Sequence, residues 1–201
     1  MADFTREEVQ TALSYTRSKI ALTGQDLSGL DLSGLNFREV NLAGTNLSGA
    51  ILTNTILFKA DLSKANLSYV QASYADFRSA KMQDVNLTGA DLHGANLDGT
   101  KLAGANLHKA ILIRTTMRGA SDLSKADLSQ ANLKGAKLYW ANLNEADLRG
   151  ADLQRVLMRQ TSLQGAKYDD QTIWPKEIVA KLMGAVLVES ETRQARNSAA
   201  D

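Results

Sequence analysis

A large apolar residue recurs at every fifth position over most of this chain, and Ala, Thr, Ser or Val precedes most of these centres by two positions. In the stretch GADLHGANLDGTKLAGANLHKA the centres are Leu92, Leu97, Leu102 and Leu107. The centres run from Leu22 to Met117, and Ala72 is the one small residue among them. The next centre, Leu123, comes one residue late, and the period then continues to Tyr168.

A five-residue period fits neither an α-helix nor a continuous strand. Five helical steps turn the apolar position by about 140°, and an odd period sends successive Leu side chains to opposite faces of a strand. The period fits a chain that turns once per repeat, with the centre and the small residue pointing inward. Gly, Asn, Asp and Ser concentrate in the other three positions, where turns favour them. The sequence therefore predicts an all-β solenoid, in which each coil covers the apolar layer of the next.

Many repeats read ADL or ANL followed by two variable residues, as in ADLSK, ANLSY, ADLHG, ANLDG, ANLKG, ANLNE and ADLRG. In this motif, A(D/N)LXX, the chain resembles the pentapeptide-repeat family, of the cyanobacterial type. The resemblance implies a right-handed quadrilateral β-helix with four repeats per coil. Twenty centres before the late one and ten from it onward then predict about seven to eight coils.

Both ends of a solenoid expose an apolar layer and strand edges, so we expect short α-helical caps. An N-terminal cap is predicted over residues 1–19, with a helix near 6–18 that begins with a capping box of Thr5 and Glu8. The β-helix is expected over 20–168 and a C-terminal cap over 169–188. This cap is expected to contain a helix over 175–183 and an extended piece over 185–188. A disordered polar tail is expected over 189–201. The resemblance leaves open a monomer or a dimer through one end of the rod, which some gyrase-protecting relatives use.

The one-residue slip lies at 120–122, and two small residues compete for the inward position there. Either Ala120 or Ser121 fits it, and the sequence does not choose between them. The resumed period indicates that the extra residue forms an outward bulge, because pushing it through the stack would misplace every later centre. The bulge is either a tolerated insertion or part of a functional edge.

The composition points away from catalysis, metals and cofactors. The chain has no Cys, and its two histidines, His93 and His108, lie three repeats apart and so on different faces of a four-sided coil. Asp and Asn alternate at the same position of the repeat, directly before the centre. A catalytic acid or base could not be replaced by Asn in this way, because the amide does not titrate. No apolar run resembles a secretory signal or a membrane span, so we expect a cytoplasmic protein.

Four repeats per coil place residues twenty apart on one face, which allows the outer surface to be sorted into columns. One column alternates arginine with other residues: Arg38, Phe58, Arg78, Asp98, Arg118, Tyr139 and Arg159. The spacing predicts cation–π contacts of Arg38 and Arg78 with Phe58, and ion pairs of Arg78 and Arg118 with Asp98. The column is either a self-satisfied ladder or, with Trp140 and the apolar Ile56 and Leu157 beside it, a protein-binding face.

The function predicted from these observations is a non-catalytic protein–protein interaction module, regulatory in role, with a partner that the sequence does not identify. The candidate partner-binding residues are Arg38, Phe58, Arg78, Arg118, Tyr139, Trp140 and Arg159. One alternative implied by the resemblance is a DNA-mimicking modulator of DNA gyrase or topoisomerase. The net charge of +1, and 16 basic against 13 acidic residues in 20–168, argue against such mimicry. Direct nucleic-acid binding is disfavoured, and a structural role stays open.

Overall fold

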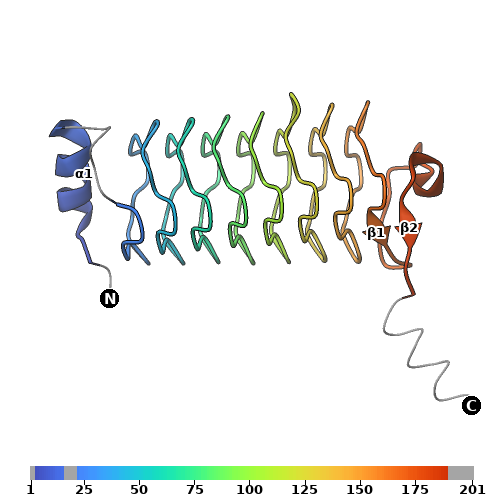
Figure 1. Cartoon of the computed structure of the whole chain (residues 1–201), viewed down its shortest axis with the longest axis horizontal. Coiled ribbons are helices and arrows are strands. Elements are labelled where there is room, and N and C mark those ends of the chain that lie inside the picture. The colour runs from blue at the N-terminus through green and yellow to red at the C-terminus, as the bar shows by residue number, and fades with distance from the viewer. Residues whose placement is uncertain (1–2, 16–21, 190–201) are drawn as a thin grey trace, which may run out of the picture.

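The computed structural model describes residues 3–15 and 22–189, and these residues form a rod of stacked coils (Figure 1). The helix α1 (Arg6–Tyr15) lies at one end of the rod. The other end holds strand β1 (Lys167–Tyr168), the 3-10 helix η2 (Ala180–Met183) and strand β2 (Val186–Leu187). No helix in the described ranges is long and apolar enough to cross a membrane.

Parallel main-chain bridges join each coil to the next. Asn46 pairs with Asp26 on one side and with Asn66 on the other, so partners are twenty residues, or four repeats, apart. The N–H of Leu47 donates to the carbonyl of Asn66 at 2.7 Å, and the N–H of Asn66 donates to the carbonyl of Thr45 at 2.9 Å. Since every coil repeats this pattern, outward residues twenty apart form columns along the rod.

The interior contains the two inward positions of each repeat. The centres from Leu22 to Leu163 are buried, including the bulky Phe37 and Phe77, and so are the residues two positions before them from Leu35 to Ala166. The second residue after each centre has a positive φ, 69° at Gly104 and 58° at Lys109. Glycine is therefore favoured at this corner, but other residues also adopt its left-handed conformation.

The Asp/Asn slot, which is the position directly before each centre, has a structural role. Its side-chain oxygen accepts the N–H of the residue two positions later, as Asp26 does from Ser28 at 2.9 Å and Asn46 does from Ser48 at 3.2 Å. A carboxylate and an amide both supply this acceptor, which explains why Asp and Asn alternate. Asn66 also donates its amide to Asn46 at 3.1 Å, so the slot links neighbouring coils.

At the slip, the structure places Ser121 in the inward position and Ala120 outside. Bridged partners are 21 residues apart across the slip, as for Lys101 and Asp122, and twenty apart after it. The buried hydroxyl of Ser121 lies 2.9 Å from the carbonyl oxygens of both Leu97 and Arg118, which share its single proton. The extra residue is thus absorbed as an outward bulge, as the resumed period predicts.

A second slip follows the last predicted centre. Asp152 bridges to Ile173, 21 residues later, which makes Trp174 the next centre after Tyr168. Thr172 occupies the small position and donates its hydroxyl to the carbonyl of Leu148 at 2.9 Å, as Ser121 does to Leu97. The repeat pattern therefore extends one repeat beyond the predicted end at 168.

The N-terminal end carries the capping box predicted from the sequence. The N–H of Thr5 donates to Glu8 Oε2 at 2.7 Å, and the N–H of Glu8 donates to Thr5 Oγ1 at 3.2 Å. Val9 and Leu13 of α1 are buried in the core of the rod. The remainder of the helix predicted to 18 lies outside the described residues.

The α-helix expected over 175–183 is wrong, because the chain forms the short 3-10 helix η2 there. The reason is the register of the following strand: Val186 of β2 pairs in parallel with Lys167 of β1, and Gly165 donates its N–H to the carbonyl of Gly184 at 2.9 Å. This pairing leaves little chain for a longer helix. The strand β2 lies inside the extended piece expected over 185–188, and 190–201 of the predicted tail lie outside the described residues.

Candidate functional site

One side of the rod carries the arginine column. We call it the arginine face and define it by the outward residues directly before, and one and two after, the centres Phe37, Leu57, Phe77, Leu97, Met117, Leu138 and Met158. All these centres are buried. The face therefore rests on a packed layer of side chains, and its outward residues are held at the spacing of the coils.

Phe58 lies between two arginines on neighbouring coils. The guanidinium carbon of Arg38 is 4.5 Å from the centre of the Phe58 ring, and that of Arg78 is 5.5 Å away. Both cation–π contacts predicted from the column spacing are thus present. Lys59 adds a third cation at 5.3 Å.

The predicted ion pairs are only half correct. Arg118 binds Asp98 on the previous coil, with Nε at 3.1 Å and Nη2 at 2.8 Å from Oδ2. Arg78 does not pair with Asp98 but with Asp76 of its own coil, through Nε at 2.8 Å and Nη2 at 2.7 Å. The Asp/Asn slot places Asp76 two residues before Arg78, and this shorter link is the one that forms.

These pairs shift the titration of their members. Hydrogen bonds from the Arg78 side chain lower the pKa of Asp76. Partial burial raises the pKa of Asp98, but the hydrogen bonds it accepts from Arg118 outweigh burial, and its pKa lies below the usual value. The same bonds raise the pKa of Arg78 and of Arg118. The carboxylates and guanidiniums are therefore charged and fixed in orientation at neutral pH.

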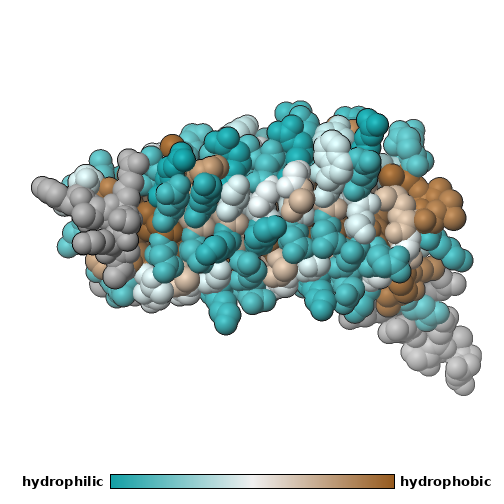
Figure 2. Space-filling model, turned by 45° about the horizontal axis from the view of Figure 1, so that its top comes forward, coloured by the Kyte–Doolittle hydropathy of each residue, from teal (hydrophilic) through white to brown (hydrophobic). Residues whose placement is uncertain are grey.

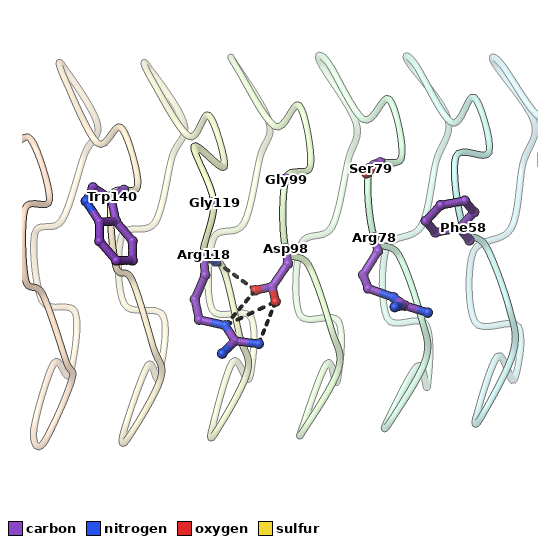
Figure 3. A pocket seen from close by; sticks show the side chains of 8 residues that line it. All are labelled: Phe58, Arg78, Ser79, Asp98, Gly99, Arg118, Gly119 and Trp140. Carbon is purple, nitrogen blue, oxygen red and sulfur yellow. Dashed lines mark hydrogen bonds and ion pairs between the residues drawn. The ribbon is translucent and has the colours of Figure 1, made fainter.

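An open groove of about 480 Å³ runs along this face. Figure 3 shows Phe58 at one end and Trp140 at the other, with Arg78, Asp98 and Arg118 along one side. Three small residues complete its lining: Ser79, Gly99 and Gly119. The groove exists because these small corner residues stand between the larger Lys59 and Trp140 of the same column.

Apolar side chains surround the groove. Trp140 is 56% exposed and contacts Tyr139 edge to face, with ring centres 6.1 Å apart. Ile56 and Leu157 occupy the Asp/Asn slot on this face and are 37% and 45% exposed. Arg159, the last residue of the column, has no ion pair within the described part of the chain. Four of the seven candidate residues thus line the groove: Phe58, Arg78, Arg118 and Trp140. Arg38 contacts Phe58 and Tyr139 contacts Trp140, whereas Arg159 lies on the coil beyond Trp140.

Sorting charges by face adds a feature that the column analysis missed. The arginine face holds six cations and three acids: Arg38, Lys59, Arg78, Arg118, Lys137 and Arg159 against Glu39, Asp76 and Asp98. Between residues 22 and 168, one of the other three faces carries four cations and four acids, and each of the remaining two carries three cations and three acids. All the net positive charge of the repeats therefore lies on the arginine face. Counting charges per column would have found this in the sequence.

The two histidines lie on different faces, as predicted. His93 contacts the Tyr74 ring edge to face, with ring centres 5.5 Å apart. His108 Nδ1 lies 2.8 Å from Ser129 Oγ, and that hydroxyl donates to Asp127 at 2.5 Å. Ser129 therefore lies between His108 and Asp127. In a catalytic triad the carboxylate bonds the histidine directly and orients it as a general base, and His108 has no such contact with Asp127. No group of three or more potential metal ligands occurs in the described ranges.

Comparison with protein families gives a direct match. Eight copies of the pattern described as pentapeptide repeats match residues 18–54, 52–84, 80–119, 121–160 and 141–167. The chain belongs to the pentapeptide-repeat family. The boundary between the third and fourth matched ranges omits Ala120, which the structure places in the outward bulge. A comparison with curated proteins gives no match.

Solved pentapeptide-repeat structures resemble the chain. A trypsin-treated form of QnrB1, a plasmid-mediated fluoroquinolone resistance protein, is 16% identical over 92% of this chain and 93% of its own, with a TM-score of 0.66. A thylakoid-lumen protein of Arabidopsis thaliana is 32% identical over 56% of this chain and 73% of its own, with a TM-score of 0.48. HetL, a heterocyst differentiation regulation protein of the cyanobacterium Nostoc, is 27% identical over 90% and 91%, with a TM-score of 0.31.

The family and the likeness to QnrB1 give the fold class, a right-handed quadrilateral β-helix. The parallel bridges between residues twenty apart agree with it. At 16% identity the likeness to QnrB1 concerns the fold alone.

Proposed function

We propose that this pentapeptide-repeat protein is a non-catalytic interaction module that binds and regulates a protein partner through the arginine face. The observation that carries the proposal is that the net positive charge of the repeats and a groove bounded by Phe58 and Trp140 lie on the same one of four faces. Arginine, tyrosine and tryptophan dominate the binding energy of protein interfaces. A regular rod places them in a fixed row, so little ordering is needed on binding.

The ion pairs of this face do not reduce it to a self-satisfied ladder. Arg78 and Arg118 are paired, but Arg159 and the Trp140 ring have neither an ion pair nor a cation–π contact among the described residues. Exposed ion pairs add little stability, about 0.2–1 kcal/mol each, so a ladder alone does not account for four arginines in one column. The pairs instead orient the guanidiniums toward a partner.

Modulation of DNA gyrase by DNA mimicry is the other function considered for this fold. Mimicry requires an acidic surface spread along the rod. Three faces of this chain are neutral and the fourth is positive, so no observation favours this function. Protection of gyrase supercoiling activity from ciprofloxacin would argue for it and against the present proposal.

The proposal is tested by changing Arg78, Arg118 and Tyr139 to Ala together and measuring partner capture in a pull-down from the native host. We expect a loss of capture with an unchanged circular dichroism spectrum. The matched control changes His108, Lys109 and Arg149 to Ala on the opposite face, the one with centres such as Leu107 and Leu148. Capture that survives in the arginine-face variant contradicts the proposal.

A further inference from the structure

We propose that the groove of the arginine face takes an acidic protein segment in an extended conformation, and that Gly119 and Ala120, at the slip, supply main-chain donors for it. This inference rests on the proposed function and names the chemistry of the partner. It follows from the charge balance of the four faces, the geometry of the two ion pairs, the unpaired main-chain groups at the slip and the length of the groove.

The charge balance selects the sign of the partner. Six cations and three acids give the arginine face a net charge of +3, whereas each of the other faces is neutral. A neutral rod with one positive face attracts an acidic partner to that face and orients it on approach. A basic segment gains no such orientation on any face.

The two ion pairs leave donors free beside the groove. Arg78 uses Nε and Nη2 on Asp76, and Arg118 uses the same two nitrogens on Asp98. The third nitrogen, Nη1, of each guanidinium has no hydrogen-bond partner within residues 3–15 and 22–189. Since each guanidinium is already fixed in orientation, binding a carboxylate to Nη1 orders no additional side chain.

The slip breaks the main-chain hydrogen bonds at the edge of the groove. In a regular coil the second residue after the centre donates its N–H to the next coil, as Gly99 does to Arg118 at 2.8 Å. At the slip the successive N–H groups of Gly119 and Ala120, both exposed, have no acceptor in the described part of the chain. The N–H of Ser121 also has none there, but Ser121 is fully buried and does not face the groove. Gly119 lines the groove, and both Gly119 and Ala120 have positive φ, 66° and 62°. Successive unpaired N–H groups at a turn bind carbonyl or carboxylate oxygens.

The aromatic rings set the length of the segment. Phe58 and Tyr139 are four coil steps apart, which at a spacing of about 4.8 Å is about 19 Å. An extended segment of about six residues spans this distance at about 3.3 Å per residue. Phe58 and Trp140 at the two ends of the groove would contact apolar side chains of such a segment (Figure 3). The occupant is therefore an acidic stretch that also carries one or two large apolar residues.

The experiment titrates three probes into ¹⁵N-labelled protein and follows the amide signals by NMR. The probes are the peptide EEWEELEE, its basic counterpart KKWKKLKK, and a single-stranded DNA of eight thymidines. We expect only the acidic peptide to shift the amide signals of Gly119 and Ala120 and the indole signal of Trp140 in a saturable way. Equal binding of the basic peptide, tighter binding of the DNA, or no binding of the acidic peptide each overturns the inference.

Three variants refine the test. Changing Arg78, Arg118 and Arg159 to Gln makes the arginine face neutral. This change should lower the affinity for the acidic peptide by about tenfold or more. The matched control changes Lys109, Arg149 and Lys167 to Gln on the opposite face, removes the same charge and should leave binding unchanged.

Deleting Ser121 restores the regular repeat GADLSK. The main-chain N–H groups at this corner should then find acceptors on the next coil, and the affinity for the acidic peptide should fall about fivefold or more. Equal affinity in all three variants contradicts the inference. If the pull-down still depends on the arginine face while the acidic peptide does not bind, the proposed function stands and this inference alone falls.

Discussion

The hydroxyl of Ser121 lies 2.9 Å from the carbonyl oxygen of Leu97, which belongs to the preceding coil. It also accepts the N–H of Gly99 at 2.9 Å. Both contacts are made from a fully buried side chain, at the point where an extra residue interrupts the repeat. The serine thus adds hydrogen bonds to main-chain groups that also keep their regular partners, since the Gly99 N–H donates to the Arg118 carbonyl at 2.8 Å and the Leu97 carbonyl accepts the Thr100 N–H at 3.2 Å.

Replacing Ser121 with Ala should therefore lower the free energy of unfolding by about 0.5–1.5 kcal/mol, because the hydrogen bonds of its buried hydroxyl are lost. Urea unfolding monitored by circular dichroism measures this change. Deletion of Ser121 is the control, since Ala120 can then take the inward position and the period is restored. We expect the deletion variant to fold and to be less destabilised than the alanine variant. The opposite order would show that the hydroxyl does not support the slip.

Two phenylalanines on the arginine face differ in their contribution to stability. Phe77 is a fully buried centre, and Phe77→Ala should cost about 3–5 kcal/mol through lost burial and a cavity. Phe58 lies outside the core between Arg38 and Arg78, and Phe58→Ala should cost about 1 kcal/mol. Chemical denaturation of both variants gives the comparison. Equal losses would contradict the assignment of inward and outward positions.

The ion pairs predict a specific pH dependence. The pKa values of Asp76 and Asp98 are lowered in the folded state, so both groups favour folding above their unfolded pKa, near 4. This contribution is lost as the pH falls through the lower, folded pKa. We expect the thermal unfolding midpoint to decrease as the pH is lowered from 6 to 3, and to decrease less when both residues are changed to Asn. An equal fall in the double Asn variant would show that other groups carry the acid sensitivity.

The C-terminal end of the rod exposes apolar side chains beside β2, and brown, hydrophobic residues gather at this end in Figure 2. Val179, Leu182 and Leu187 are all more than half exposed there. A strand edge with exposed apolar residues favours association with a second copy. We expect concentration-dependent dimerisation by light scattering, abolished by Leu182→Glu with Leu187→Glu. A monomer at all concentrations would contradict this expectation.

The periodicity predicts the fold and the columns because every residue in a coil has one of only five environments. It therefore placed Arg38, Phe58 and Arg78 in contact without any structure. It did not choose between Ala120 and Ser121, since both are small enough for the inward position and the choice depends on the buried carbonyl of Leu97. A small hydroxyl residue also holds the inward position in regular repeats, as Thr45 and Thr55 do, so it does not mark a slip. The spacing of Thr172 two positions before Trp174 does match the repeat and would have identified Trp174 as a further centre.

The sequence was less informative where the repeat ends. Residues 175–183 have a good helical composition, but the pairing of Val186 with Lys167 limits the helix to η2. The pairing of Arg78 with Asp76 was missed for a similar reason, since column analysis compares residues twenty apart and this contact lies within one coil. Such local contacts depend on side-chain reach rather than on period.

Photo-crosslinking tests the central claim, partner binding through the arginine face, most directly. A benzophenone amino acid replaces Ser79 at the groove edge, or Ser129 on the opposite face as the matched control, and the protein is irradiated in extract of the native host. We predict a discrete adduct with one protein from position 79 and none from position 129, and loss of the adduct when Arg78, Arg118 and Tyr139 are changed to Ala. Equal adducts from both positions, or an adduct only from position 129, would contradict it.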